Sequence, residues 1–285
     1  MRAVVPEYPS FEQTGVHAAS VFEIMRSHSP QRSAAETELE TAGEGLRLYG
    51  TIRSYRHSAK CESLFRAFDF SALGGQIVCL LGASGTGKTT FLRILLSEHD
   101  GLFDGDVRYR VNEAELGSTE AARLGILGFV APGDSLVPWK TVSENLLLPA
   151  HINPHLSRPD ERSLADVINS LGLKPTDLNL LPHELSLGMR QRVQFSRLLV
   201  YRPRFSLLDE PFHGLDPANT KRLATALREY VTTSRTCCIL VTHDVLTAQQ
   251  TADDFLFLSR GGQVRQLSAQ PTQADLLSVF QEDME

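Results

Sequence analysis

The chain has 285 residues, of which 42% are hydrophobic and 22% are charged, and this composition is ordinary for a globular protein of one large domain or two modest ones. Its formal net charge of -6 argues against broad nucleic-acid binding, and no stretch approaches the roughly 20 uninterrupted apolar residues of a membrane-spanning helix. The four cysteines lack metal-ligand spacing, which favours a reducing, cytosolic setting.

The N-terminal part of the chain divides into an extension and a strand-rich segment. Residues 1–44 mix Pro, Ser, His, Glu and Ala, so we expect a flexible extension there. From residue 45 to 52 apolar residues recur at every second position, and residues 63–70 alternate in part. With a further strand pattern around 105–111, these segments predict a small antiparallel β layer.

The stretch Gly82–Thr89 reads GASGTGKT and lies between a buried-strand pattern at 77–81 and a helix pattern at 91–96. This is the P-loop (Walker A) pattern in its required context, which favours nucleotide binding over a plain tight turn. Glycines let backbone N–H groups point into one concavity, and the helix adds its positive end, so a phosphate chain is held. Lys88 would reach the β and γ phosphates, and the Thr89 hydroxyl would ligate Mg²⁺. The predicted nucleotide contacts are Gly82, Ala83, Ser84, Gly85, Thr86, Gly87, Lys88, Thr89 and Thr90.

The second half of the chain predicts a helical insertion followed by more core strands. Helix patterns replace strand patterns between residues 141 and 202. Continuous apolar runs at 205–209 and 237–241 predict parallel strands buried on both faces, with a helix at 223–231 between them. The tail at 270–285 has room for one short helix.

Two of these strands end in side chains suited to phosphoryl chemistry. Asp209 and Glu210 follow one strand, and His243 follows the next. Neighbouring parallel strands deliver their carboxyl ends to one crevice, so we expect these groups to meet. Asp209 would hold Mg²⁺, Glu210 would polarise the attacking water as general base, and His243 would contact the γ-phosphate and that water. The alternatives are a solvated acidic turn and a structural histidine, and the P-loop favours the catalytic interpretation.

A Ser-x-Gly helix start at Ser186 and Gly188, followed by Gln191 and Arg192, precedes the Asp-Glu pair. Here the sequence resembles the ATP-binding cassette (ABC) family, whose signature is Leu-Ser-Gly-Gly before a basic Gln-Arg helix. The resemblance covers about Leu46 to Leu267. It implies an α/β P-loop cassette with a mixed or parallel core sheet, an antiparallel β subdomain and a helical insertion. The expected divisions are an extension at 1–44, an ATPase domain at 45–268 with its helical subdomain at about 141–202, and a tail at 269–285.

The resemblance also implies further site residues, ligands and a second subunit. Tyr55 matches the aromatic residue that stacks on adenine, although the pattern equally fits a plain strand residue. Asp216 matches the D-loop. In the family, the helix start at Ser186 and Gly188 caps the nucleotide bound by the opposite subunit. One chain would therefore pair with itself or a related cassette around ATP and Mg²⁺.

Two departures from the family pattern bear on activity. Pro132 stands where the family has a glutamine that contacts Mg²⁺ and water, and Asp134 is a candidate substitute. Leu187 replaces the first glycine of the signature pair. We expect the remaining groups to preserve hydrolysis, and Pro132 and Leu187 to make it slow or differently coupled. A catalytically impaired regulatory cassette is the alternative.

The segment Leu136–Asn145 resembles importer cassettes of the nitrate, sulfonate, taurine and thiamine-precursor group. In those cassettes it lines the groove that receives a coupling helix of the permease. Trp139 would be an anchor there or a core residue, and the pattern leaves both open. The resemblance implies a peripheral ATPase subunit at the cytoplasmic face of the inner membrane. This subunit would power import of a small solute through permease subunits, which in turn would contact a solute-binding protein. No nucleic acid is expected, and a non-import ABC complex is an alternative.

Overall fold

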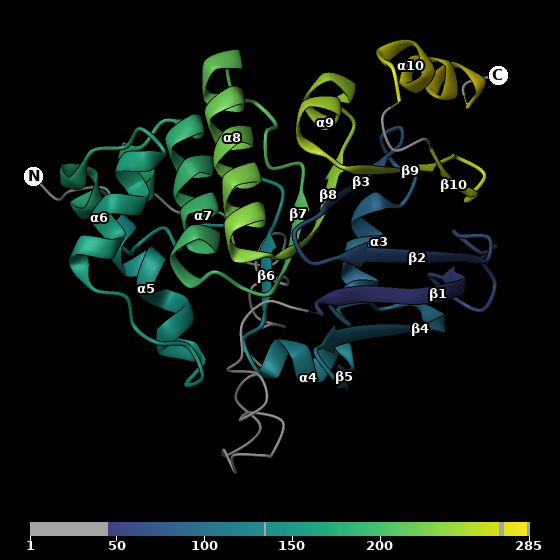
Figure 1. Cartoon of the computed structure of the whole chain (residues 1–285), viewed down its shortest axis with the longest axis horizontal. Helices are drawn as coiled ribbons and strands as arrows, with labels where there is room; N and C mark the ends of the chain where they lie inside the picture. The colour runs from purple at the N-terminus through teal and green to yellow at the C-terminus, as the bar shows by residue number, and fades with distance from the viewer. Residues whose placement is uncertain (1–44, 134, 268–270, 284–285) are drawn as a thin grey trace, which may run out of the picture. The chain divides into compact units, whose positions relative to one another are not determined.

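The computed structural model describes residues 45–133, 135–267 and 271–283. The predicted extension at 1–44 and the candidate substitute Asp134 lie outside the described residues. Across the described ranges, each helix is too short or too polar to cross a membrane. Figure 1 shows the arrangement of the strands and helices.

Four strands form a small antiparallel sheet in the order β2-β1-β4-β5 (Figure 1). The strands are β1 (Arg47–Arg56), β2 (Phe68–Leu73), β4 (Leu102–Val111) and β5 (Ala114–Leu116). The predicted antiparallel layer is confirmed, but its second strand begins at Phe68 and not at residue 63. The preceding residues form a loop because their backbone N–H groups bond elsewhere: Leu64 donates to the Tyr55 carbonyl and Arg66 to the Gly262 carbonyl.

Six strands form the core sheet in the order β10-β9-β3-β8-β7-β6. They are β3 (Ile77–Leu81), β6 (Leu127–Val130), β7 (Phe205–Asp209), β8 (Cys237–Thr242), β9 (Asp254–Leu258) and β10 (Val264–Gln266). Five strands run parallel, and β10 pairs antiparallel with β9. Strands β3, β7 and β8 are buried along their whole length, which confirms the two-sided burial predicted from their apolar runs.

Successive side chains of β3 serve two separate hydrophobic cores because a strand has a period of two residues. Val78 and Leu80 belong to the core shared with α3 and the small sheet. Ile77, Cys79 and Leu81 belong to the core shared with the later helices. The core sheet thus lies between two apolar layers.

The helices agree with the predicted alternation of core and insertion. They are α3 (Lys88–Leu95), α4 (Ser118–Arg123), α5 (Val142–Ile152), α6 (Glu161–Ser170), α7 (Leu187–Tyr201), α8 (Pro217–Ser234), α9 (Val245–Thr251) and α10 (Gln273–Glu282), with 3₁₀ turns η1 (Pro175–Asn179) and η2 (Pro182–Glu184). Helices α5, α6 and α7 pack on one another around a third hydrophobic core (Figure 1). The chain is an α/β protein with a mixed core sheet, an antiparallel β layer and a helical insertion, as predicted.

Candidate active site

The P-loop connects β3 to α3 and is shaped by glycine. Gly87 has a φ of 106°, a left-handed conformation, and α3 begins directly after it without a side-chain cap. At Gly82 a Cβ atom would lie 2.5 Å from the carbonyl oxygen of Leu258, so only glycine fits between the two backbones. The uncapped N–H groups of α3 therefore remain open to an anion.

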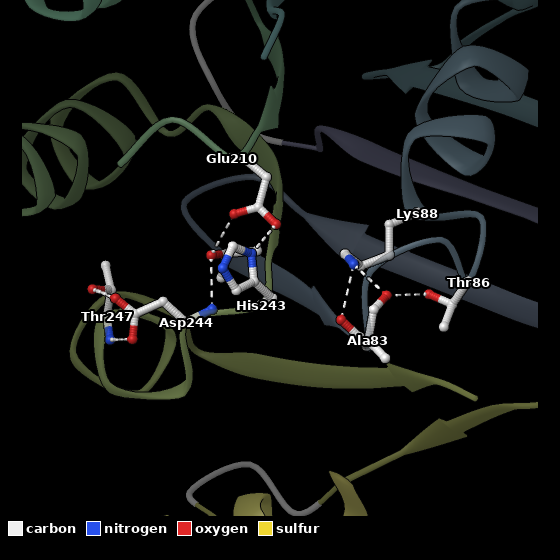
Figure 2. Close-up of polar contacts among 9 residues, drawn as sticks. Ala83, Thr86, Lys88, Glu210, His243, Asp244 and Thr247 are labelled. Atoms are coloured by element: carbon white, nitrogen blue, oxygen red, sulfur yellow. Dashed lines mark hydrogen bonds and ion pairs between the residues drawn. The ribbon is translucent and has the colours of Figure 1, made fainter. Parts of the chain in front are cut away.

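The ammonium group of Lys88 lies inside this loop. Its Nζ atom donates hydrogen bonds to the carbonyl oxygens of Gly82 and Ala83, each at 2.8 Å (Figure 2). The hydroxyl of Thr86 donates to the same Ala83 carbonyl at 3.0 Å. Burial lowers the pKa of Lys88, while the nearby negative charge of Glu210 acts in the opposite direction. A phosphate oxygen entering the loop would meet a cation that is already positioned by main-chain acceptors.

Asp209 ends β7 with 1% of its surface exposed. A hydrogen bond from the Thr89 hydroxyl lowers the pKa of this carboxyl, but burial raises it and is the larger effect. Its Oδ2 atom has no hydrogen-bond partner, although buried carboxylate oxygens almost always have one. An unsatisfied buried carboxylate oxygen beside a hydroxyl is a donor set that suits Mg²⁺.

Mg²⁺ is usually bound by one or two carboxylates together with substrate phosphates, not by a cage of protein ligands. Among the described residues, no group of three or more His, Cys, Asp or Glu side chains could hold a metal ion. Thr89 and Asp209 therefore fit a Mg²⁺ ion that arrives with a nucleotide.

Both carboxylate oxygens of Glu210 are held by the end of the neighbouring strand. His243 donates from Nδ1 to Oε1 at 2.7 Å, and the Thr242 hydroxyl donates to Oε2 at 3.0 Å (Figure 2). The Thr242 hydroxyl oxygen in turn accepts the backbone N–H of Asp244 at 3.1 Å. Glu210 itself has a left-handed φ of 49°, which ends β7. The carboxylate is thus fixed in one orientation, as a general base must be.

These groups face one cavity of about 590 Å³. Its lining residues are Ala83, Ser84, Gly85, Gly87, Lys88, Thr89, Thr90, Asp209, Glu210, His243 and Phe280. The structure therefore brings the predicted phosphate loop, metal ligands and general base to the same place, although Gly82 and Thr86 belong to the loop without lining the cavity. A cavity of this volume is in the range that accommodates a nucleotide.

Tyr55, the predicted adenine-stacking residue, is not among the lining residues. Its side chain is 3% exposed, and its ring packs against His57, Phe65 and His99. A Cβ atom at Gly101 would lie 2.6 Å from the Tyr55 hydroxyl oxygen, so the ring is enclosed by backbone as well. The Tyr55 ring is thus buried beside the small sheet and outside the described cavity, and its contact with adenine stays a prediction.

The predicted signature and D-loop residues cap helices outside the cavity. The Ser186 hydroxyl accepts the Met189 N–H at the start of α7, and Oδ1 of Asp216 accepts the Asn219 N–H at the start of α8. None of the described residues Ser186, Gly188 and Asp216 lines the cavity of its own chain.

Both residues that depart from the family pattern lie at the surface. Pro132 is exposed just after β6. The adjacent Gly133 carbonyl accepts a 2.8 Å hydrogen bond from Nε2 of Gln194, a buried residue of α7. Leu187 is 46% exposed, and its Cδ2 atom lies 3.2 Å from where a Cβ atom of Gly214 would be. A leucine at the signature thus covers the segment just before the D-loop aspartate.

Trp139 is 66% exposed, so the interpretation as a core tryptophan is wrong. Asn145 takes the buried position in this segment, where it accepts the Val137 N–H and donates to the carbonyls of Val137, Lys140 and Thr141. The indole is left at the surface ahead of α5.

Two residues near the site, Phe280 and His213, were not anticipated. Phe280 lines the cavity from α10. The His213 ring lies 6.0 Å, between centroids, from that of His243. The backbone carbonyl of His213 accepts a hydrogen bond from Nε2 of Gln191, which links α7 to the segment after Glu210. For His213 the sequence held one indication of a place near the site, namely its position three residues after Glu210. For Phe280 in the tail helix it held no such indication.

The profile of the ABC transporter family matches residues 65–213. The chain is 34% identical over 234 residues to the sulfate/thiosulfate import ATP-binding protein CysA 1 of Chromobacterium violaceum, covering 76% of this chain and 64% of that protein. It is 36% identical over 191 residues to the lipoprotein-releasing system ATP-binding protein LolD 1 of Chlorobium luteolum, covering 64% of this chain and 80% of that protein.

Two of the first curated relatives are considerably longer than the matched part: the chain spans 64% and 58% of the CysA proteins of Chromobacterium violaceum and Ralstonia nicotianae. Among solved structures, an ATP-binding subunit of an ABC transporter matches with a TM-score of 0.68 and 21% identity, covering 84% of this chain and 100% of that chain. The dimeric cassette MJ0796, bound to ADP and Pi, matches with a TM-score of 0.65 and 22% identity, covering 80% and 100%. These likenesses show the fold.

Proposed function

This chain belongs to the ABC transporter family, and on that premise we propose that it is an ATP-binding and ATP-hydrolysing subunit that powers import of a small solute through partner permease subunits. The observation that carries the proposal is the single cavity lined by the P-loop, Asp209 and the Glu210–His243 pair. These residues would supply the three parts that phosphoryl transfer needs: a phosphate cradle, a carboxylate for the metal ion and a positioned base.

The P-loop binds the phosphates. Open N–H groups at the start of α3 and the positive end of that helix attract the anion. Lys88 exchanges its hydrogen bonds with the Gly82 and Ala83 carbonyls for bonds to phosphate oxygens. This exchange costs little rearrangement, because the ammonium group already lies within the loop.

Thr89 and Asp209 would hold Mg²⁺ through the Thr89 hydroxyl and the unsatisfied Oδ2 atom of Asp209. When bound, the ion neutralises charge on the phosphoryl oxygens. Burial raises the pKa of Asp209 because it removes water from the charged carboxylate. The unpaired Oδ2 atom would therefore be stabilised by a bound cation.

Glu210 accepts the proton of the attacking water. The hydrogen bond from His243 occupies Oε1 and the one from Thr242 occupies Oε2, so the carboxylate cannot rotate freely. His243 is about half exposed at its side chain and Glu210 about one fifth. The base is therefore reached from the open side of the cavity, where a water would stand.

A second subunit would complete the site. Each chain carries one P-loop and one signature segment, and the described Ser186, Gly188 and Asp216 do not line their own cavity. The helix α7 starts at Leu187 and offers its N-terminal N–H groups as a cap for a neighbour's nucleotide. We therefore infer two composite sites in a dimer, most simply a homodimer, that ATP holds together.

The relatives bear on what the complex moves. CysA proteins are named for sulfate and thiosulfate import, whereas LolD is named for lipoprotein release. The CysA relatives support import, with a solute-binding protein reached through the permease. The exposed Trp139 ahead of α5 suits a permease contact and thus a peripheral position at the cytoplasmic face of the inner membrane. A regulatory cassette with impaired hydrolysis is the second candidate, favoured by Pro132 and Leu187.

Phosphate release from Mg·ATP by the purified chain tests the proposal. Glu210→Gln should lower turnover about 100-fold or more and accumulate an ATP-bound dimer in size-exclusion chromatography, because binding survives without the base. Glu229→Gln removes an exposed carboxylate of α8 and should leave turnover unchanged. Equal phosphate release by the wild-type chain and Glu210→Gln would favour the regulatory cassette.

A further inference from the structure

The C-terminal helix α10 is anchored to the rest of the chain at three places. Its Leu276 side chain is fully buried in the core that the later helices share with β3 and β9. The ring of Phe280 meets that of Phe257 on β9 with centroids 5.0 Å apart and an interplanar angle of 82°. Just after the helix, Oδ1 of Asp283 accepts the backbone N–H of Arg260 at 2.8 Å. These contacts fix both the first half and the last turn of α10.

Helix α10 packs against α9, the short helix that begins just after His243 (Figure 1). Ala248 of α9 is fully buried in the same hydrophobic core as Leu276 of α10. In addition, Nε2 of Gln249 on α9 donates a 3.0 Å hydrogen bond to the carbonyl of Pro271, just before α10. Apolar packing and a hydrogen bond thus join the two helices.

Helix α9 depends on such neighbours because it is short. It spans seven residues, Val245–Thr251, and an isolated helix shorter than about 12 residues is marginally stable at best in water. Among the described elements, α8, β3 and α10 pack against it. Loss of the α10 contact would therefore loosen α9 on one of its sides.

The start of α9 is bonded to the groups that hold the general base. The Asp244 side chain caps α9 by accepting two of its first backbone N–H groups. The Asp244 N–H donates to the Thr242 hydroxyl at 3.1 Å, and that hydroxyl donates to Oε2 of Glu210. His243, between these two residues, donates to the other carboxylate oxygen (Figure 2). A shift of α9 would therefore displace both donors of Glu210.

Phe280 also brings α10 to the cavity itself. It lines the cavity that Glu210 and His243 face. A phenyl ring makes no ordinary hydrogen bond, so its contribution there is packing and not a chemical step. Its contact with Phe257 fixes the last turn of α10 beside the cavity. One helix thus supports α9 with its first half and reaches the cavity with its last turn.

We propose that the docked helix α10 is a positioning element for the Glu210–His243 pair. Phe280 is its positioning residue: the ring holds α10 on β9, α10 holds α9, and α9 keeps the His243 imidazole directed at Glu210. This inference rests on the proposed hydrolysis of ATP. It gives the tail of the chain a part in the rate of hydrolysis and none in nucleotide affinity.

Phosphate release and calorimetry with ADP separate rate from affinity in the full chain. Phe280→Ala should lower kcat about tenfold and leave the Kd for ADP unchanged. Phe280→Leu keeps an apolar side chain on Phe257 and should restore most of the rate. Leu277→Ala removes a side chain of the same helix that is 46% exposed and does not line the cavity, and should match the wild type. An unchanged kcat in Phe280→Ala, or an equal loss of rate and affinity, overturns the positioning role.

A variant on α9 covers the case in which Phe280→Ala does not fold. Gln249→Ala removes the hydrogen bond to the Pro271 carbonyl at an exposed position and should lower kcat about threefold with an unchanged Kd for ADP. Gln250→Ala, at the next exposed position of the same helix, is the matched control and should behave as the wild type. Equal kcat values in the two variants would count against the link between α9 and α10.

A double variant tests whether α10 acts through the imidazole. In a His243→Ala chain the positioned group is already missing, so adding Phe280→Ala should lower kcat much less than tenfold. A full tenfold further loss would show that α10 acts elsewhere and overturns the inference.

The ring ¹⁵N resonances of His243, assigned by comparison with His243→Ala, report its Nδ1 hydrogen bond directly. They should move in Phe280→Ala and stay in place in Leu277→Ala. Resonances that stay in place in Phe280→Ala overturn the role of α10. This measurement needs no turnover, so it decides the inference separately from the proposed hydrolysis, which a wild-type chain without phosphate release would overturn.

Discussion

His243 Nδ1 lies 2.7 Å from Glu210 Oε1, which joins the end of β8 to the residue directly after β7. The two strands are parallel neighbours, and Asp209 pairs in register with Val241, so both polar residues emerge at the same edge of the sheet. The contact is thus a consequence of topology, and it gives His243 a role that does not require it to touch substrate: it can orient the base.

Replacing His243 by Ala should lower ATP turnover about 100-fold and leave ATP affinity unchanged, because Glu210 loses the donor that holds Oε1 while the P-loop is untouched. Steady-state phosphate release and calorimetry measure the two quantities. His183→Ala, at an exposed position of η2, is the matched control and should behave as the wild type. Loss of ATP binding in His243→Ala would contradict an orienting role.

Thr242 holds the other carboxylate oxygen of Glu210, and its hydroxyl also accepts the Asp244 N–H. Thr242→Val should therefore reduce turnover about tenfold and cost about 1 kcal/mol of unfolding free energy. Thr236→Val is the control: its buried hydroxyl donates to the Pro203 carbonyl, so it should lose similar stability but keep full turnover. Denaturant unfolding and phosphate release distinguish the pair. Equal turnover in both variants would show that Thr242 has a structural role alone.

The sequence was sufficient to predict the strands in which every residue is apolar. The apolar runs of β3, β7 and β8 need two covered faces, and this fixed them as central strands and brought Asp209, Glu210 and His243 together. Helix starts at Thr141 and Ser186 follow from their hydroxyl caps in the same local way.

Features that depend on distant contacts were not predictable. The alternation around Tyr55 indicates a strand but cannot show that His57, Phe65 and His99 enclose the ring. Phe280 has no motif around it, and its place in the cavity depends on packing against Phe257. The pattern around Trp139 likewise does not show that Leu136, Val142 and Asn145 take the buried positions of this segment.

Pro132 and Leu187 should slow hydrolysis. Leu187 covers Gly214 beside the D-loop, and Pro132 offers no side-chain ligand, so the Pro132→Gln, Leu187→Gly variant should hydrolyse ATP several-fold faster than the wild type. Phosphate release by the isolated dimer measures this basal rate. Leu187→Ala separates loss of side-chain bulk from the added backbone freedom of glycine. A basal rate equal to that of the wild type would exclude the hypothesis.

The carboxylate of Asp216 caps α8 and should make stability depend on pH in acid. Its pKa lies below the ordinary value of 3.8, chiefly because it accepts the Asn219 N–H and side-chain amide. A carboxyl whose folded pKa is depressed stabilises the fold above its ordinary pKa, and that contribution is lost as the pH falls through the folded value.

At neutral pH, Asp216→Ala should therefore melt a few degrees below the wild type, and the difference should shrink in acid below pH 3.8. Asp216→Asn keeps a capping oxygen without a titrating group, so its melting temperature should respond less to acid, and Asp166→Ala on the exposed face of α6 should match the wild type throughout. A difference between the wild type and Asp216→Ala that stays constant from neutral pH to acid would show that the ionised carboxylate does not stabilise this helix.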